Sequence, residues 1–327
     1  MTAISVIICT HNPRKDYFER VLHALRAQTL PQNQWELLIV DNASAHPIAP
    51  NWDISWHADA RHVREEQLGL SLARLRGIAE TNGEVLVFVD DDNVLADNYL
   101  NEALRIAAEW PQLGVWGSGC TLPEFELEPP DKIRRYIHYL TIVDINAPRW
   151  TNIPNCYDAF PCGAGVCLRA SVGSAYRTFY ESSEIRVTGR RGTDLLSGED
   201  AEICHVACDM GFGMGIFPDL KLTHLIPQRR LTSEYLIRLV EGIHFSGYLV
   251  NFKHFGHLPT SPHCGIELLR FIKYGALRRG IDRQMFLARR RAMRRARAIV
   301  RDIKANGANV LGTAKFRDLH ANSADQG

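Results

Sequence analysis

Short apolar runs and amphipathic segments alternate along the first half of this chain. Residues 4–10, ISVIICT, are apolar and β-branched, as in a buried strand, and residues 18–25 then carry apolar side chains at helical spacing. The alternation continues with strand-like runs at 35–41, 84–90 and 113–120 and helix-like segments at 70–80 and 98–110. This pattern predicts an α/β domain with a mostly parallel central sheet flanked by helices.

Composition places the chain among globular proteins. Hydrophobic residues make up 46% of the 327 residues and charged residues 23%. No apolar stretch reaches the roughly 18 to 20 residues that span a bilayer. The first residues, MTAISVIICTHNP, lack the basic region and long apolar run of a signal peptide. With eight cysteines and no CxxC pair, these features favour reduced thiols and a cytoplasmic protein.

Polar residues follow three of the predicted strands directly. Thr10 ends the first strand and Asn12 lies just after it, and Asp41 ends the second. Asp90 ends the run at 84–90, and Asp91 and Asp92 follow directly. Ligands of parallel sheets bind outside the carboxyl ends of the strands. We therefore expect these side chains to converge on one crevice.

Asp90, Asp91 and Asp92 pose a question of charge. Adjacent carboxylates repel one another, and each is costly to desolvate unless it is paired. Carboxylate oxygens suit Mg²⁺ or Mn²⁺, which proteins commonly bind through one or two carboxylates and the phosphates of a substrate. A solvated acidic turn that caps the next helix is the alternative. The GxxxxGK[ST] and GxGxxG motifs are absent, which disfavours P-loop and dinucleotide-dependent enzymes.

Further candidate site residues lie later in the chain. The glycine-rich stretch 188–200, which we expect to be mobile, ends with Glu199 and Asp200, and a helical pattern starts at these two residues. His224 ends a short alternating strand and offers a nitrogen ligand for the same ion. The stretch CHVAC, residues 204–208, lacks a second ligand pair for zinc, so its cysteines are interpreted as core residues.

Six segments, in this order, resemble the family 2 glycosyltransferases of GT-A fold. They are a strand followed by THN, a strand followed by VDNAS, then GLSLARLRGIAETNGEVLVFVDDDN, GAGVCLRAS, SGEDAEICHVACDMGF and PDLKLTHLIPQRRLT, and they span roughly residues 3–250. The resemblance implies a GT-A fold and a nucleoside-diphosphate-sugar donor, most simply a UDP-sugar. It also implies a single displacement that inverts the anomeric centre.

The resemblance assigns the donor contacts. Thr10 and Asn12 would line the base and ribose, and Asp41 would accept a hydrogen bond from the base. Arg74 matches an arginine near the base and diphosphate, with a solvated helix face as its alternative. The family usually has asparagine after this arginine, whereas this chain has Leu75.

Two further donor contacts follow from the same resemblance. Gly163 lies in CGAG, which is similar to the segment beside the donor sugar, where small residues allow a close approach. Arg229 or Arg230 would reach the diphosphate when the site closes, with a solvated arginine as the alternative.

The aspartates at 90–92 match the DxD motif of the family. Asp90 and Asp92 fit its two acidic positions, with Asp92 as the direct ligand of Mn²⁺ or Mg²⁺ and Asp91 as the partner of the ribose hydroxyls. His224 matches the histidine that completes the metal site in many members, and a surface histidine is the alternative. The ion would hold the diphosphate leaving group.

Asp200 matches the second residue of the family's ED motif, the general base. It would take the proton of the acceptor hydroxyl as that oxygen attacks the anomeric carbon. Glu199 would orient the acceptor or the loop. The acceptor itself, whether a glycan, a lipid-linked sugar or a small molecule, is not identified by any motif.

We place the catalytic domain at 1–227, with a nucleotide-sugar half at about 1–120 and an acceptor half at about 121–227. A helical C-terminal region then covers 228–327. Residues 266–304 hold thirteen Lys and Arg against three Asp and Glu, a net charge of +10 in a chain whose total is +1. This asymmetry indicates that the two regions have different tasks.

Residues 283–304 have the pattern of a basic amphipathic helix. Three interpretations remain open. The helix lies on an anionic membrane, which would make the protein peripheral on a cytoplasmic membrane face and suit a lipid-linked acceptor. It packs on the catalytic domain with its arginines in solvent. It binds nucleic acid, for which a basic helix alone is poor evidence, and no nucleic-acid partner is predicted.

Two other functions compete with glycosyl transfer. A sugar nucleotidyltransferase often has a glycine-rich, basic phosphate-binding stretch near its N-terminus, and THNPRK is not one. A non-catalytic relative would bind sugar nucleotides or nucleic acid. The intact candidates for metal ligand and base, Asp92 and Asp200, argue against it.

Overall fold

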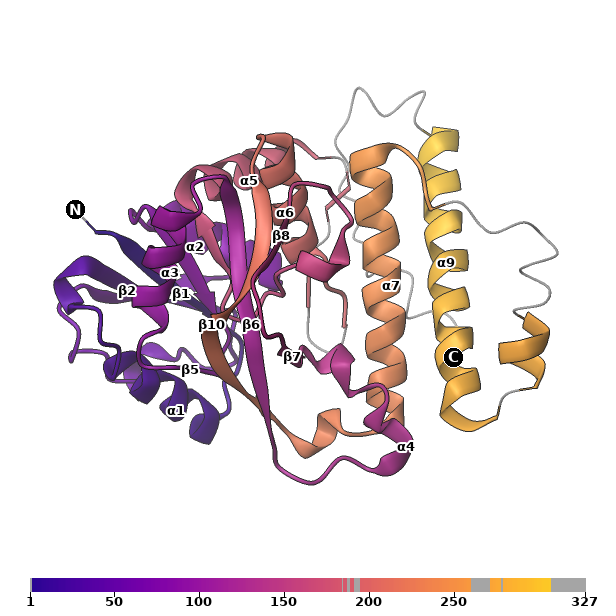
Figure 1. Cartoon of the computed structure of the whole chain (residues 1–327), viewed down its shortest axis with the longest axis horizontal. Coiled ribbons are helices and arrows are strands. Elements are labelled where there is room, and N and C mark those ends of the chain that lie inside the picture. Colours follow the sequence, from indigo (N-terminus) through magenta and orange to yellow (C-terminus); the bar gives the residue numbers. More distant parts are fainter. Residues whose placement is uncertain are drawn as a thin grey trace.

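The computed structural model describes residues 2–183, 185–186, 189–190, 195–259, 271–277 and 279–306. One sheet forms the centre of the molecule, with strand order β3-β2-β1-β4-β9-β6-β10-β5 (Figure 1). Its first half consists of parallel strands, namely β1 (Ile4–Thr10), β2 (Trp35–Asn42), β3 (Ala60–Glu65) and β4 (Val85–Val89). The carboxyl ends of these strands therefore meet at one edge.

The second half of the sheet is mixed. Its two long strands, β6 (Leu113–Phe125) and β10 (Gly213–Ile226), are parallel to each other. Short antiparallel strands complete it: β5 (Asn93–Leu95), β7 (Val143–Asp144), β8 (Arg149–Thr151) and β9 (Cys167–Arg169). The predicted mostly parallel sheet is confirmed for the long strand pairs, whereas β9 joins the two halves in the antiparallel sense.

Helices cover both faces of the sheet, because successive side chains of a strand point to opposite faces. On β1, Ile4, Val6 and Ile8 pack with helices α1 (Lys15–Arg26) and α3 (Tyr99–Glu109). Ile7 and Cys9 pack instead with α2 (Leu70–Glu80), α5 (Ala170–Ser182) and α6 (Glu199–Asp209). The strand is thus buried on both sides, as its unbroken apolar run predicts.

Two long helices lie side by side beyond the sheet (Figure 1). They are α7 (Ser233–Phe255) and α9 (Gly280–Asn306). The Thr232 hydroxyl accepts a hydrogen bond from the Tyr235 amide at the start of α7, and Gly256 ends that helix at φ 73°. The short α4 (Asp131–Arg134) packs near them through Ile133. Short helical turns are η1 (Gln32–Gln34), η2 (Ala49–Asn51), η3 (Ile137–Leu140), η4 (Tyr157–Ala159), η5 (Gln228–Arg230) and the π-turn η6 (Phe271–Ala276).

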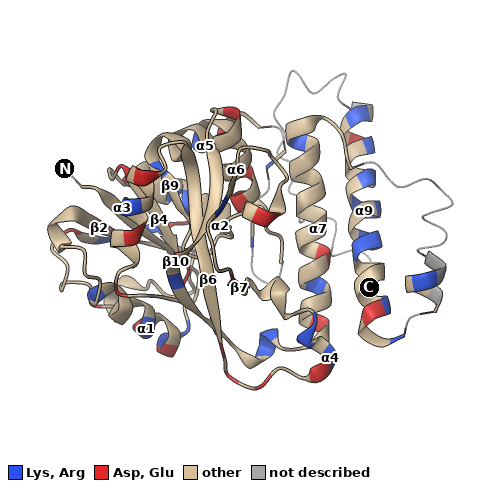
Figure 2. Ribbon diagram, in the orientation of Figure 1, with Lys and Arg blue, Asp and Glu red and all other residues tan. Residues whose placement is uncertain are grey.

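The basic segment 283–304 lies within α9, and its apolar face is buried. Buried side chains recur about every fourth residue, at Met285, Ala288, Ala292, Ala296 and Val300, and Ala292 and Ala296 share a cluster with residues of α7. The arginines lie along the rest of the helix (Figure 2). This is the packed arrangement among the three interpretations of the segment. No helix in the described part of the chain is long and apolar enough to cross a bilayer.

The second half departs from its predicted pattern in places. His224 lies inside the long strand β10 rather than at the end of a short one. Helix α6, in contrast, begins at Glu199 as predicted. Much of the predicted mobile stretch before it, residues 188 and 191–194, lies outside the described residues.

Candidate active site

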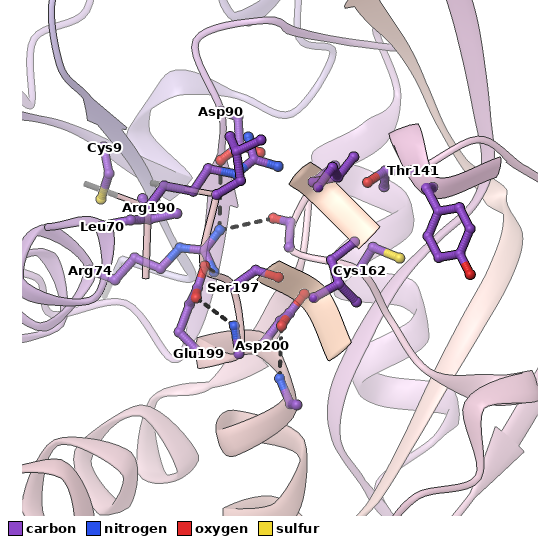
Figure 3. Close-up of a pocket in the computed structure, with 18 of the residues that line it drawn as sticks. Cys9, Leu70, Arg74, Asp90, Thr141, Cys162, Arg190, Ser197, Glu199 and Asp200 are labelled. Atoms are coloured by element: carbon purple, nitrogen blue, oxygen red, sulfur yellow. Dashed lines mark hydrogen bonds and ion pairs between the residues drawn. The ribbon is translucent and has the colours of Figure 1, made fainter. Parts of the chain in front are cut away.

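A cavity of about 1210 Å³ opens at the carboxyl ends of the parallel strands (Figure 3). It is bounded by the ends of β1, β2 and β4, the start of α6, residues 138–164 and one side of α7. Pockets for a single drug-sized ligand measure about 300 to 1,000 Å³. The cavity is therefore larger than a typical pocket for one such ligand.

The cavity brings together every predicted site residue except Asp41. These are Thr10, Asn12, Arg74, Asp90, Asp91, Asp92, Gly163, Glu199, Asp200, His224 and Arg230. They come from segments up to 220 positions apart in the sequence. The convergence expected from the polar strand ends therefore holds for Thr10, Asn12 and residues 90–92 but not for Asp41.

The three aspartates after β4 have different partners. Asp90 lies 3.6 Å from the Arg74 guanidinium, the Thr10 hydroxyl donates a hydrogen bond to Asp91, and Asp92 accepts from Arg230 at 2.9 Å. Burial and the neighbouring Asp92 charge raise the pKa of Asp91 to about 7. The repulsion within the triplet is thus reduced by separate partners and by a proton held more tightly on Asp91.

Asp92, His224 and Arg230 form a compact buried group. His224 Nε2 lies 3.6 Å from Asp92 Oδ2, and Arg230 Nη1 lies 3.1 Å from the same histidine nitrogen. Burial opposes ionisation of Asp92, but Arg230 and His224 outweigh it and hold its pKa well below the usual range. The two predicted metal ligands therefore already share one cationic group.

In the described residues, no three metal-ligating side chains gather around one point. Asp92 and His224 are the nearest approach to such a site, and Asp90 turns to Arg74 instead. A carboxylate and an imidazole that hold a guanidinium have the charge and donor types that a divalent cation requires. The pair therefore fits a cation whose remaining ligands come from a bound phosphate.

Arg74 links the strand ends to helix α6. Its side chain is 2% exposed, and Nη1 lies 3.5 Å from Glu199 Oε1. Its Nη2 donates to the Gly163 carbonyl at 3.4 Å. A Cβ at Gly163 would lie only 2.8 Å from that nitrogen. The glycine thus allows the CGAG segment to approach the guanidinium, which holds Asp90 and Glu199 on either side of it (Figure 3).

Asp200 lies in the first turn of α6. Its Oδ1 accepts a hydrogen bond from the Ala201 amide at 2.9 Å. Burial and the adjacent Glu199 charge raise the pKa of Asp200 to about 6, against the opposing effect of Arg74. A carboxyl group with a pKa near the working pH has the property expected of a general base.

Asp41 does not reach the cavity. Its carboxylate accepts hydrogen bonds from the amides of Ser44 and Ile48 and pairs with Arg64 at 2.7 Å. The adjacent Asn42 lines the cavity instead. Asp41 therefore shapes the loop after β2, and the predicted contact with a base is not supported by its position.

Sequence reasoning missed the aromatic side of the cavity. Tyr139, Tyr157, Phe160, His244 and Tyr248 all line it. No motif marks the first three, which lie in the irregular region before β9. The cavity-facing residues of α7 recur at positions 239, 243, 247 and 251, a helical spacing that would have identified this face once α7 was placed beside the sheet.

The CHVAC segment lies in α6. Cys204 is buried in the core beneath the sheet, and burial raises the pKa of its thiol well above the usual value. His205 Nε2 lies 3.2 Å from Asn155 Oδ1. The pattern therefore serves packing and a polar contact with the cavity wall.

Comparison with solved structures defines the class of fold. A TarS structure from S. aureus in complex with UDP-GlcNAc superposes with a TM-score of 0.51 at 14% identity, covering 94% of this chain and 92% of that one. The mannosyltransferase PcManGT from Pyrobaculum calidifontis, in complex with GDP-Man and Mn²⁺, gives 0.51 at 20% identity, covering 93% and 79%. The fold is the GT-A fold of glycosyltransferases.

Residues 5–153 match the model of glycosyl transferase family 2. Over these residues the chain is similar to that family. Curated relatives include glycosyltransferase AglE from Haloferax volcanii, 33% identical over 92 residues, and putative glycosyltransferase EpsH from Bacillus subtilis, 28% identical over 115 residues. The matches cover 27% and 35% of this chain and about a third of each relative, 30% and 33%.

Proposed function

We propose that this protein is an inverting, metal-assisted glycosyltransferase. It would move a sugar from a nucleoside-diphosphate sugar to a hydroxyl group of an acceptor. One observation carries the proposal: residues 90–92 and Asp200, the candidates for donor binding and proton transfer, open into one cavity at the strand ends. The acceptor is taken to be a glycan, a lipid-linked sugar or a small molecule.

The nucleotide would lie over β1 and β2. Thr10, Asn12 and Asn42 line this side of the cavity. The Thr10 hydroxyl holds Asp91 beside it, and Asp91 would accept hydrogen bonds from the ribose hydroxyls. The TarS and PcManGT complexes hold a uracil and a guanine nucleotide, respectively, and we favour a UDP-sugar for this chain.

The diphosphate would lie between Asp92 and Arg230. Asp92 and His224 would hold a Mn²⁺ or Mg²⁺ ion, and PcManGT was solved with Mn²⁺. The ion supplies neutralisation of the charge that develops on the leaving diphosphate. Because Arg230 already contacts both residues, it would move from them onto a phosphate oxygen when the donor binds.

Asp200 would act as the general base. It takes the proton of the acceptor hydroxyl while that oxygen attacks the anomeric carbon from the face opposite the diphosphate, and this geometry inverts the centre. Glu199 is held by Arg74 and by the Gly198 amide at 3.0 Å. It would position the start of α6 rather than touch the reacting atoms.

The basic helix α9 would have a supporting role. Its apolar face is buried against α7, so its contact with an anionic membrane would rest on arginines alone. We propose that the protein works in the cytoplasm and that any membrane association is electrostatic and released by salt. Vesicle sedimentation at low and high salt tests this, and binding that persists at high salt would contradict it.

The decisive experiment measures donor binding and its dependence on metal. UDP with Mn²⁺ should raise the melting temperature, since a ligand at 100 times its dissociation constant adds about 2.7 kcal/mol to stability. Chelation should reduce the shift, and Asp92→Ala should remove the metal effect while the protein stays folded. Equal shifts with and without chelator would contradict the metal assignment.

A second measurement separates glycosyl transfer from nucleotidyl transfer. Slow hydrolysis of a UDP-sugar should release UDP and free sugar in the presence of Mn²⁺. A nucleotidyltransferase would instead release pyrophosphate from UTP and a sugar phosphate. The second product pattern would overturn the proposal.

A further inference from the structure

The cavity has two chemically different parts. All five carboxylates that line it belong to residues 90–92 and 199–200, at the strand ends and the start of α6. The other part lies between α7 and the irregular segment before β9. We call it the α7 arm and define it by Tyr139, Asn155, Tyr157, His244, Gly247, Tyr248 and Asn251. None of these side chains carries a carboxylate, a guanidinium or an ammonium group.

One face of α7 forms the first wall of the arm. Leu239, Ile243, Gly247 and Asn251 are spaced four residues apart and all line the cavity, as expected of one helical face. A Cβ built on Gly247 meets no atom of the described residues within 4 Å. The centre of this wall is therefore open space rather than packed protein.

The opposite wall is held in an uncommon backbone conformation. Thr141, at φ 59°, and Asn155, at φ 68°, both line the cavity. A left-handed conformation is costly for a β-branched threonine, and such strain tends to persist where the surrounding structure serves a ligand. Thr141 lies across the cavity from Arg74 and Glu199 (Figure 3).

His244, one of the residues that define the arm, contributes a polar ring to it. Its Nε2 is buried and has no hydrogen-bond partner among the residues that the structure describes. Burial lowers the pKa of His244 to about 4, so the ring is neutral at physiological pH and can donate from one nitrogen and accept at the other. A buried polar atom without a partner is costly unless a ligand pairs with it.

The arm is tied to the segment that carries Asp200. The Ser197 amide donates to the Ser246 hydroxyl at 3.2 Å, immediately before Gly247. Lys253 of α7 pairs with Glu202 of α6 at 2.6 Å. A ligand in the arm would thus lie against the same packed unit that holds Asp200 in the cavity.

We propose that the α7 arm is the acceptor subsite and that the acceptor is an uncharged saccharide. This deepens the proposed function and rests on it. A sugar ring has apolar C–H faces and a polar rim. Tyr139, Tyr157 and Tyr248 offer apolar ring faces with polar tips, and Asn155, Asn251 and His244 offer neutral donors and acceptors. An acceptor recognised through an anionic group would need cationic side chains that line the arm. Arg289 donates a hydrogen bond to the Tyr139 hydroxyl but does not line the cavity.

The transfer step is then complete in atoms and charge. The acceptor oxygen forms a bond to the anomeric carbon of the donor as the bond from that carbon to the diphosphate oxygen breaks. The bonding electrons leave with the diphosphate. The hydroxyl proton of the saccharide passes to a carboxylate oxygen of Asp200.

The test fills the arm without touching the strand ends. Gly247→Leu places a side chain in the open space, and Gly247→Ala is the matched control, because it adds only the Cβ that meets nothing. Both variants should fold, since glycine is a poor residue in a helix interior. Saturation-transfer NMR would measure binding of UDP with Mn²⁺ and of free maltose, cellobiose and N,N′-diacetylchitobiose.

The expected result separates the two ligands. Wild type and Gly247→Ala bind UDP and at least one disaccharide. Gly247→Leu keeps UDP binding but binds the disaccharide at least about tenfold more weakly. A folded wild type that binds UDP but no disaccharide, or an equal disaccharide signal in Gly247→Leu, overturns the proposal. Failure of the wild type to bind UDP counts against the proposed function instead.

A second pair of variants tests the chemistry of recognition. Tyr248→Phe keeps the ring and should retain most of the disaccharide signal, whereas Tyr248→Leu should lose it. A short-chain polyprenyl phosphate serves as competitor. Its binding to the arm in place of the disaccharide, detected as a signal that Gly247→Leu abolishes, would assign the arm to an anionic lipid and overturn the saccharide.

Discussion

The strand ends and the α7 arm are two halves of one cavity built on different principles. At the strand ends, each carboxylate of the triplet has its own partner: Asp90 pairs with Arg74, Asp91 with Thr10 and Asp92 with Arg230. The α7 arm is aromatic and uncharged, with open space at Gly247. A diphosphate and a cation are recognised by charge, whereas a saccharide is recognised by shape and by hydrogen bonds. The comparison assigns recognition of the donor to the strand ends and recognition of the acceptor to the α7 arm.

The largest expected effect is at Asp200, where the two halves meet. Asp200→Asn keeps the shape of the side chain but cannot accept a proton. Transfer to a competent acceptor should fall by about 10²- to 10⁴-fold, the usual contribution of a general base. UDP binding and disaccharide binding should both stay close to wild type. A variant that loses donor binding together with transfer would show that Asp200 has a structural role instead.

The contact between α6 and α7, which joins the two halves of the cavity, can be tested by its effect on the free energy of unfolding. Glu202 and Lys253 form a buried ion pair with side chains 0% and 6% exposed. Lys253→Met leaves the Glu202 carboxylate without its partner and should cost about 3 to 5 kcal/mol, measured by urea unfolding. The double variant with Glu202→Met should recover most of this loss. Equal stability of the single variant and wild type would show that α6 and α7 are joined by other contacts.

The acidic strand ends could be predicted from the sequence because they depend on short motifs. A buried strand that ends in several charged residues has few structural explanations. Asp90 to Asp92 could therefore be predicted as site residues from the sequence alone. The α7 arm depends on how α7 packs beside the sheet and on the backbone of residues 138–160, neither of which leaves a local pattern. Asp41 shows the limit of motif matching. Its carboxylate accepts hydrogen bonds from the Ser44 and Ile48 amides and pairs with Arg64, so it does not face the cavity.

The pH dependence of transfer tests the electrostatics around Asp200. Burial and Glu199 raise its pKa to about 6, and the base acts only when ionised. Transfer should therefore be constant above this pKa and fall about tenfold per pH unit below it. Glu199→Gln removes one cause of the raised pKa, so the acidic limb should move to lower pH. A limb at the same pH in both proteins would mean that it reports another group.

The smallest expected effect concerns Arg230, and it has opposite signs for two ligands. Arg230 bridges Asp92 and His224, at 2.9 and 3.1 Å, and so competes with a free cation for both. Removing it by Arg230→Gln should tighten binding of Mn²⁺ alone by up to about tenfold, since hydrogen bonds to charged groups contribute about 1.5 to 3 kcal/mol and part of this is regained in solvent.

The same variant should bind UDP with Mn²⁺ more weakly than wild type, because it lacks the cationic group that would move onto the diphosphate. Isothermal titration of each ligand measures both changes. Arg229→Gln is the matched control: it removes an equal charge from a neighbour that also lines the cavity but has no hydrogen bond or ion pair to Asp92 or His224 among the interactions of the described residues. Tighter Mn²⁺ binding in both variants would trace the effect to net charge, whereas tighter binding in Arg230→Gln alone would assign it to the bridge. Unchanged Mn²⁺ affinity in Arg230→Gln would mean that the guanidinium does not occupy the cation position in solution. The strand ends would then differ from the α7 arm in charge, but no guanidinium would fill their cation position before the donor binds.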